Sequence, residues 1–251
     1  MAEDGTVGKA LEVLDRVAGA ARPLRFAEVQ GLCPLPKATL HRLLSTLVSQ
    51  GMLRQDNGTY APGLRLVRLA HAAWEAAALA PLAAPVLDRL ADRTGEAVHL
   101  AELDQGQVVY LDKRHAARPV TMFAQAGKVG PAYCTGIGKA MLAHLAPGPL
   151  ETALARQSFH GFTPATIRDA GALRAELAAI RAEGVAYDRE EHEPGIRCIA
   201  APVLSDKGGL IAGLSVTSAR LSLDELGGLA PLLRAAAAEI AAAAGPWRFP
   251  E

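Results

Sequence analysis

The chain has 251 residues, half of them hydrophobic, and its 26 basic side chains balance its 26 acidic ones. This length favours two domains, and the lack of an apolar run of about 18 residues or of a leader peptide argues against a membrane-spanning or secreted protein. Its three dispersed cysteines, Cys33, Cys134 and Cys198, argue against a disulfide framework or paired metal-binding motifs, so we expect a cytoplasmic chain with reduced thiols, no metal and no cofactor.

The N-terminal part shows the periodicity of three consecutive helices. Apolar residues from Val7 to Ala20 follow the three-four spacing of an amphipathic helix, and a shorter segment, 26–32, follows it. A third helix is expected from Pro36, which suits a first helical turn, to Gly51. Its predicted buried stripe consists of Leu40, Leu43, Leu44, Leu47 and Val48.

A hairpin is predicted directly after the third helix. Residues 52–61 form two short extended pieces around Asn57-Gly58, the dipeptide that best suits a type I′ turn. Three helices followed by such a hairpin are typical of a winged helix-turn-helix. We therefore predict a DNA-binding domain of this type over residues 1–63.

The start of the third helix is the expected DNA-reading element. In a helix-turn-helix these positions point outward and reach base edges, so Arg42 can bind a guanine and Lys37 a phosphate. Between Cys33 and Arg68 there are five basic residues and one acidic residue, Asp56. A winged helix that contacts only proteins is the alternative interpretation. The predicted DNA contacts are Lys37, Ala38, Thr39, His41 and Arg42 in the helix and Arg54 and Asn57 in the wing.

A helix rich in alanine and leucine is expected to link the two domains. It covers residues 64–80 and should break at Pro81. The second domain, residues 81–251, is expected to be α+β. Because its strand segments come as hairpins, around residues 104–107 and 206–209, an antiparallel sheet flanked by helices is favoured over a Rossmann sheet. Further segments are predicted to be helical at 163–183 and 223–244 and extended at 185–192.

Several segments resemble the IclR-type family of bacterial transcriptional regulators. The stretch from Leu35 to Leu44 is similar to the recognition helix of that family, and Gly136-Ile-Gly-Lys-Ala-Met-Leu-Ala143 resembles its G-x-G-K-A-x-L-A motif. Segments Asp188–Pro202 and Gly213–Thr217 resemble later motifs in the same order. The resemblance implies a GAF-like effector domain, a homodimer or homotetramer, and control of genes for the catabolism of organic acids or aromatic compounds.

The glycine-rich turn after Thr135 is a candidate anion site. A nucleotide phosphate loop would need a glycine at Tyr133 and a hydroxyl residue at Ala140, so that interpretation is disfavoured. Thr135 can cap a helix reaching about Leu145, which leaves N–H groups near Gly136, Ile137 and Gly138 for a carboxylate.

The family resemblance adds further residues to this candidate pocket. It implies that a small carboxylate or aromatic acid is held by Gly136, Ile137, Asp188, Cys198, Ser215 and Thr217. Ser215 and Thr217 are two apart on a predicted strand and so share a face. The alternative is that these are ordinary cap, core and strand residues.

The leading hypothesis is a regulator, without enzymatic activity, that binds double-stranded operator DNA and changes its DNA affinity when an effector binds. One alternative is a small-molecule enzyme with a DNA anchor, for which Asp188, His192 and Cys198 would supply an acid, a base and a thiol. Another alternative is a DNA-binding protein that responds to no effector.

Overall fold

The computed structural model describes residues 5–76, 79–118 and 121–245. The chain divides into two compact units, residues 1–77 and residues 78–251. The first unit has one hydrophobic core and the second has two, so each unit is described by itself. Among the described residues, no helix is both long and apolar enough to cross a lipid bilayer.

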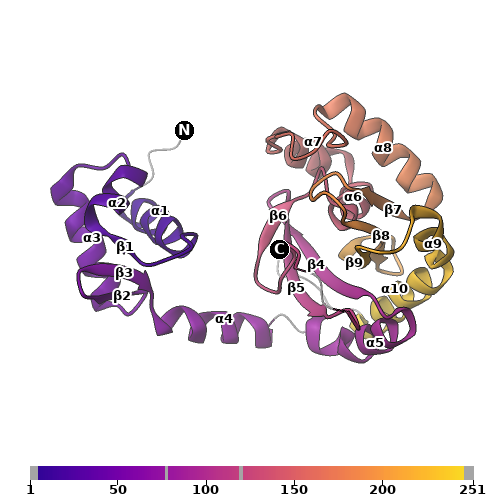
Figure 1. Cartoon of the computed structure of the whole chain (residues 1–251), viewed down its shortest axis with the longest axis horizontal. Coiled ribbons are helices and arrows are strands. Elements are labelled where there is room, and N and C mark those ends of the chain that lie inside the picture. Colours follow the sequence, from indigo (N-terminus) through magenta and orange to yellow (C-terminus); the bar gives the residue numbers. More distant parts are fainter. Residues whose placement is uncertain (1–4, 77–78, 119–120, 246–251) are drawn as a thin grey trace. The chain divides into compact units, whose positions relative to one another are not determined.

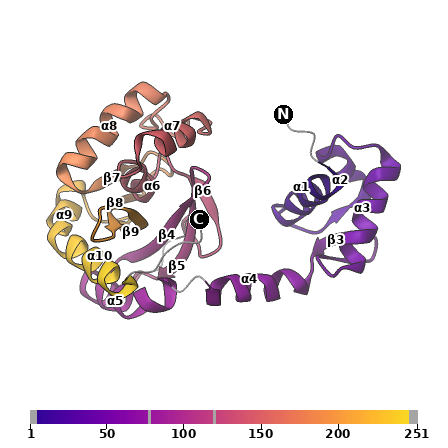
Figure 2. The ribbon, with the colours of Figure 1, turned by 180° about the vertical axis from the view of Figure 1, so that it is seen from behind.

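The first unit is a winged helix-turn-helix, as predicted (Figure 2). Three helices pack their apolar stripes together, so that Leu40 and Leu44 are buried against Val13 and Val17. The elements are α1 (Thr6–Ala18), β1 (Leu24–Arg25), α2 (Phe26–Leu32), α3 (Lys37–Ser49), β2 (Leu53–Asp56), β3 (Thr59–Pro62) and α4 (Leu64–Ala76).

The wing contains one strand more than the sequence pattern predicts. The hairpin of β2 and β3 turns at Asn57 and Gly58, which both have positive φ as a type I′ turn requires. The short β1 then pairs with β3, placing Leu24 opposite Tyr60. Two residues carry too little periodicity to be recognised as a strand, so only tertiary pairing defines β1.

The second unit is built on an antiparallel sheet with the described strand order β6-β5-β4-β9-β8-β7. Its central pair, β4 with β9, brings together segments far apart in the sequence, whereas β8 and β9 form the predicted hairpin. The elements are α5 (Leu79–Thr94), β4 (Ala97–Asp104), β5 (Gln107–Arg114), β6 (Val129–Pro131), α6 (Gly136–Leu142), α7 (Pro147–Ala155), α8 (Ala170–Glu183), β7 (Ala186–Arg189), β8 (Arg197–Leu204), β9 (Leu210–Ser218), α9 (Leu223–Gly228) and α10 (Ala230–Ala244).

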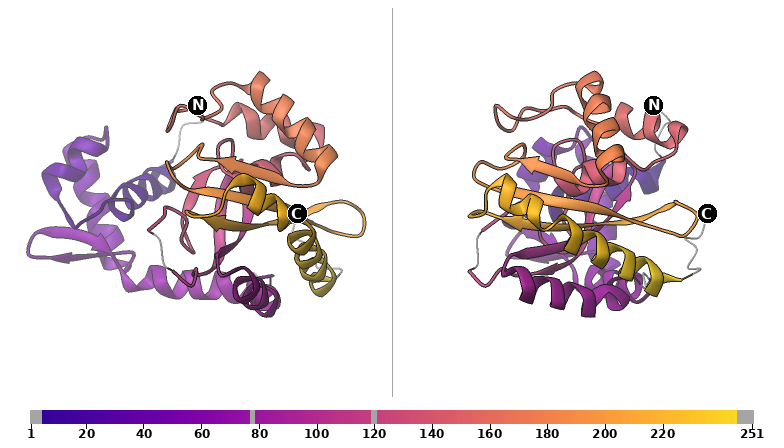
Figure 3. Two further views of the ribbon diagram at one scale, coloured as in Figure 1. Left: turned by 45° about the vertical axis from the view of Figure 1, so that its right-hand side comes forward. Right: turned by 90° about the vertical axis from the view of Figure 1, so that its right-hand side faces the viewer.

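Helices cover both faces of this sheet (Figures 1 and 3). On one face α5, α9 and α10 pack onto a core that includes Val98, Leu214 and Val216. On the other face α6 and α8 cover a second core, which includes Ala101 and Tyr110. Alternation along each strand therefore separates the two cores, and the residues of the candidate effector site lie on the α6 face.

Three expectations about helix limits are wrong. Pro81 does not break a helix but lies in the first turn of α5, where its missing N–H has no partner to lose. The helix expected from Thr163 begins only at Ala170, capped by Asp169, whose side chain accepts a hydrogen bond from the Ala172 N–H. The expected single C-terminal helix is divided at Leu229 into α9 and α10.

Candidate functional site

The exposed face of α3 carries the residues expected to read DNA. Lys37, Ala38, His41 and Arg42 are exposed and Thr39 is half-buried, while the leucine stripe behind them enters the core. Residues four apart lie on one helix face, so Ala38 and Arg42 are neighbours there, as are Lys37 and His41. This arrangement leaves the predicted helix contacts accessible to a DNA groove.

The wing presents the two remaining predicted DNA contacts. Arg54 is exposed on β2, and Asn57 is exposed at the tip of the hairpin. Arg54 also lines an open groove together with Arg65 and Arg68 from α4. These two arginines were counted in the basic composition but were not predicted as contacts, because nothing in the local pattern brings α4 beside the wing.

The second candidate site lies between α6 and the sheet, and strand register assembles it. Cys198 on β8 is directly opposite Asp188 on β7 and Thr217 on β9. In the next row of the same face, Ser215 on β9 is directly opposite His99 on β4. These side chains line one buried pocket together with Gly136 and Ile137, so the structure brings all six predicted effector residues together.

Two glycines allow the start of α6 to pack closely against neighbouring segments. A Cβ on Gly136 would lie 2.5 Å from Cys198 Sγ and 3.0 Å from the Asp188 backbone nitrogen. A Cβ on Gly138 would lie 2.5 Å from Ala132 Cα. The Gly138 N–H donates to Thr135 Oγ1, 3.3 Å away, which confirms the predicted cap but removes this N–H from the donors expected for an anion.

Asp188 is a buried carboxyl group held in a fixed orientation. Its Oδ1 accepts a hydrogen bond of 2.7 Å from the Glu191 N–H. Burial, with a smaller contribution from the Glu191 carboxylate, raises the pKa of Asp188 to about 7. At neutral pH the group is therefore close to half-protonated and can both donate and accept hydrogen bonds.

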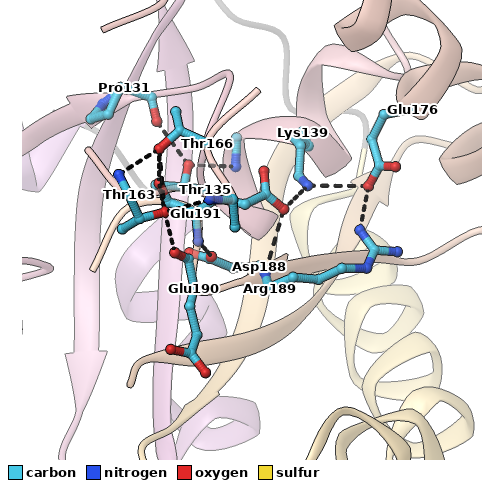
Figure 4. A network of polar contacts seen from close by, with 12 residues as sticks. Pro131, Thr135, Lys139, Thr163, Thr166, Glu176, Asp188, Arg189, Glu190 and Glu191 are labelled. Atoms are coloured by element: carbon cyan, nitrogen blue, oxygen red, sulfur yellow. Dashed lines mark hydrogen bonds and ion pairs between the residues drawn. The ribbon is translucent and has the colours of Figure 1, made fainter. Parts of the chain in front are cut away.

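A buried ion network fixes the segment that follows Asp188 (Figure 4). The Lys139 ammonium is completely buried and bonds Glu191 Oε1 and, at 3.1 Å, Glu176 Oε1. Arg189 donates to the same Glu176 oxygen at 2.7 Å. Lys139 thus joins α6, α8 and the segment after β7, and its charge is already balanced by two carboxylates.

The loop before α8 supports the same segment. The hydroxyl of Thr163 donates to the Glu190 carbonyl at 2.7 Å, and that of Thr166 donates to the Glu191 carbonyl at 2.6 Å (Figure 4). These bonds explain why residues 163–169 are not helical, since both hydroxyls are used to hold the segment after β7. The backbone that orients Asp188 is therefore anchored from two sides.

Several pocket residues were not predicted from the sequence. They come from β4, from β5, from the segment before β6 and from the segment after β7, and they include His99, Tyr110, Met122, Phe123, His192, Glu193 and Ile196. The signal that could have found His99 is its place opposite Ser215, which requires the β4–β9 register. His192 had been considered only as a catalytic base.

Hydrogen bonds connect two segments of the pocket wall, the one that contains Phe123 and the one that contains Glu193. The Glu193 carboxylate accepts hydrogen bonds of 2.9 and 3.1 Å from the Phe123 N–H. The ring of Phe123 lies against His192, with centroids 5.0 Å apart. The free volume inside is about 30 Å³, enough for about two water molecules, so a larger occupant requires the pocket lining to move apart.

Comparison with known proteins decides the family. The model of the IclR C-terminal domain of bacterial transcriptional regulators matches residues 71–242, and that of the IclR helix-turn-helix domain matches residues 6–57. This chain belongs to the IclR family.

Other members of the IclR family match along nearly the whole chain. The HTH-type transcriptional regulator XynR of Escherichia coli is 34% identical over 222 residues, which cover 88% of each chain. A putative IclR regulator from Silicibacter sp. TM1040 superposes with a TM-score of 0.82 at 29% identity, covering 98% of this chain and 100% of the other. An IclR homologue from Microbacterium hydrocarbonoxydans, solved with 4-hydroxybenzoate, gives 0.80 at 26% identity, covering 95% and 98%.

The chain is thus a DNA-binding transcriptional regulator with a C-terminal effector-binding domain. The family assignment confirms the sequence-based prediction of fold and general function. The particular DNA and effector contacts of this chain remain predictions.

Proposed function

We propose that this IclR regulator acts in the cytoplasm as a homo-oligomer, that it controls catabolic genes, and that an organic acid bound between α6 and the sheet alters its affinity for operator DNA. The observation that carries the proposal is the convergence of Asp188, Cys198, Ser215 and Thr217, from three strands, on one buried pocket beside the start of α6. Buried polar groups gathered around a cavity are typical of a ligand site.

The chemistry of the pocket supports an organic acid as its ligand. Ser215 and Thr217 offer hydroxyl donors, and Asp188 can donate when protonated, so an incoming carboxylate can share its proton instead of being repelled. Met122, Phe123 and Ile137 provide apolar wall for a carbon skeleton. The solved complex of the Microbacterium homologue with 4-hydroxybenzoate also favours an acid of this type.

The state of Cys198 disfavours the alternative of an enzyme. Burial, ahead of the nearby Asp188 charge, raises the pKa of this thiol to about 12, so it stays protonated at neutral pH. A nucleophilic cysteine needs the thiolate, which a basic environment provides. His192 is packed between the rings of Phe123 and Phe162, with centroids 5.0 and 4.7 Å away, which favours a role in the pocket wall.

Exposed apolar side chains support the proposed oligomer. On α4, Leu64 and Val67 are three residues apart and 81% and 64% exposed, and on α1, Val7 is 74% exposed. Helix-turn-helix proteins bind paired half-sites as dimers, and contact with a second copy would cover such residues.

The test begins with genomic DNA. Full-length protein is incubated with fragments of its own genome at physiological salt, and the retained fragments are sequenced. We expect a few palindromic sites beside catabolic genes, whose substrates then provide candidate acids. Titration of these acids into the protein–operator complex should change the operator Kd. An acid that binds the protein but leaves the operator Kd unchanged would show that the two sites are not coupled.

A further inference from the structure

His99 lines the candidate effector pocket, and its hydrogen bonding is incomplete. Its side chain is 1% exposed, and its Nδ1 lies 3.3 Å from Thr217 Oγ1. Its Nε2 is also buried but has no hydrogen-bond partner among the described residues. No other described residue that lines this pocket has such an unpaired side-chain atom. A buried polar atom left unpaired is uncommon and requires an explanation.

The imidazole is neutral under physiological conditions. Burial, followed by the nearby charges of Lys113 and His115, lowers the pKa of His99 to about 3. A neutral ring has one N–H and one lone pair, and the Thr217 hydroxyl can either donate to Nδ1 or accept from it. Nε2 can therefore donate to an oxo group or accept from a hydroxyl, depending on the tautomer that Thr217 supports.

We propose that His99 Nε2 binds a second oxygen of the effector, apart from its carboxylate, and thereby selects hydroxy or oxo acids over plain carboxylic acids. The inference rests on the proposed function, because it assumes an organic acid in this pocket. A hydrogen atom or methyl group in place of that oxygen would leave Nε2 unpaired in the complex. Sites built to hydrogen-bond a ligand group reject the analogue that lacks it for this reason.

Matched acids test the selectivity directly. Full-length protein is titrated calorimetrically with propionate, lactate and pyruvate, and with benzoate and 4-hydroxybenzoate. We expect lactate or pyruvate to bind at least about tenfold more tightly than propionate, or 4-hydroxybenzoate to exceed benzoate by that factor. The comparison of lactate with pyruvate distinguishes a hydroxyl partner of Nε2 from an oxo partner.

Substitution then assigns the selectivity to His99. His99→Phe keeps a ring near Tyr110, whose centroid is 5.7 Å away, but has no nitrogen, and His99→Asn removes the group at Nε2 independently of ring packing. Both variants should bind the oxygenated and plain acids within about threefold of each other, while His99→Gln, which can reach the Nε2 position, restores part of the preference. Glu102→Gln is the control, since Glu102 also has a buried unpaired atom on β4 but does not line the pocket.

Thermal unfolding without acid separates a binding role from a structural one. His99→Phe removes the unpaired Nε2 but also the bond between Nδ1 and the Thr217 hydroxyl, so a fall in Tm of a few degrees or less fits a residue whose Nε2 serves only the effector. A Tm lowered by several degrees together with intact acid preference would make His99 structural and overturn the inference.

The titrations also separate this inference from the proposed function. Equal binding of plain and oxygenated acids by the wild-type protein would contradict the role of His99 and leave the organic-acid effector standing. If the wild-type protein bound none of these acids, the proposed effector class would be wrong. The inference about His99 would then also be wrong, because it assumes an organic acid in the pocket.

Discussion

At the scale of single residues, neighbours decide what each functional group can do. Arg42 is exposed on α3 and available to DNA, whereas the equally charged Lys139 is buried and paired with Glu176 and Glu191. Asp188 and His99 face the same pocket, and burial disfavours the charged form of each by shifting their pKa values in opposite directions.

Replacing Arg42 by alanine should weaken binding to the specific operator by about 1–3 kcal/mol and relax the preference at one base pair, because a bidentate contact with guanine is lost. Electrophoretic mobility-shift titrations on the operator and on single-base variants measure both effects. Arg16→Ala is the matched control, since Arg16 is exposed on α1, where it pairs with Glu12. An equal loss on all sequences would identify a phosphate contact instead.

The raised pKa of Asp188 predicts a pH-dependent difference between the wild type and Asp188→Asn. Its folded pKa, about 7, exceeds its ordinary value of 3.8, so the folded state holds the proton more tightly. The carboxyl therefore stabilises the protein least above pH 7, and its contribution to the free energy of unfolding falls as pH rises between about 4 and 7.

Relative to the wild type, Asp188→Asn should gain stability across that window by up to about 1.4 kcal/mol per pH unit, because an amide cannot ionise but can still accept from the Glu191 N–H. Urea unfolding of both proteins at pH 4.5, 6 and 7.5 measures the change. The difference between them must be used, since His99 gives the wild type a slope of opposite sign below pH 6.5. A difference that does not vary with pH would mean that Asp188 ionises normally.

At the scale of elements, the position of α6 against the sheet determines the pocket. The helix starts at a glycine beside Cys198, and Lys139 in its second turn bonds α8 and the segment after β7. Because β8 supplies Cys198 and β7 supplies Asp188, a displacement of α6 would move the backbone N–H groups at its start away from these side chains. Close backbone approach is thus a requirement of the site as well as of the fold.

Gly136→Ala should lower the free energy of unfolding by about 1–3 kcal/mol and weaken acid binding, because the added methyl would lie 2.5 Å from Cys198 Sγ. Gly148→Ala is the matched control on α7. Nothing lies within 4 Å of its added methyl, so it should be neutral or stabilise by about 0.5–1 kcal/mol. Urea denaturation measures the free energy of unfolding of both variants. Similar values for the two would show that α6 can shift to make room for the added methyl group.

At the scale of the whole molecule, the proposed regulation needs at least two copies of the chain. A single winged helix makes few base contacts, and joining two of them raises the affinity for paired half-sites by about 100-fold or more. The exposed apolar residues of α4 are the candidate contacts between copies.

Val67→Asp should shift the protein toward monomer in sedimentation velocity and reduce operator affinity by about 100-fold, because a buried charge would oppose association. Ala72→Asp introduces the same charge at an exposed position on another side of α4 and should leave the assembly unchanged. An unaltered sedimentation coefficient for Val67→Asp would place the interface elsewhere.

The sequence by itself determined the winged helix-turn-helix, the antiparallel character of the second domain and the family. Local signals carry these features: the leucine stripe of α3, the Asn57-Gly58 turn and the motif around Gly136 depend only on neighbouring residues. Where tertiary contacts compete with local pattern, as at Thr163 and Thr166, the predicted helix failed because their hydroxyls bond a distant backbone.

Only the tertiary structure decided which residues complete the pocket. His99 meets Ser215 and Thr217 because β4 pairs with β9 across more than a hundred residues, and Phe123 meets Glu193 through a bond that no periodicity encodes. Strand order and register result from the packing of the whole sheet between its two helical layers. Hydrophobic pattern specifies which face of a strand is buried, but it does not specify which strand lies beside it.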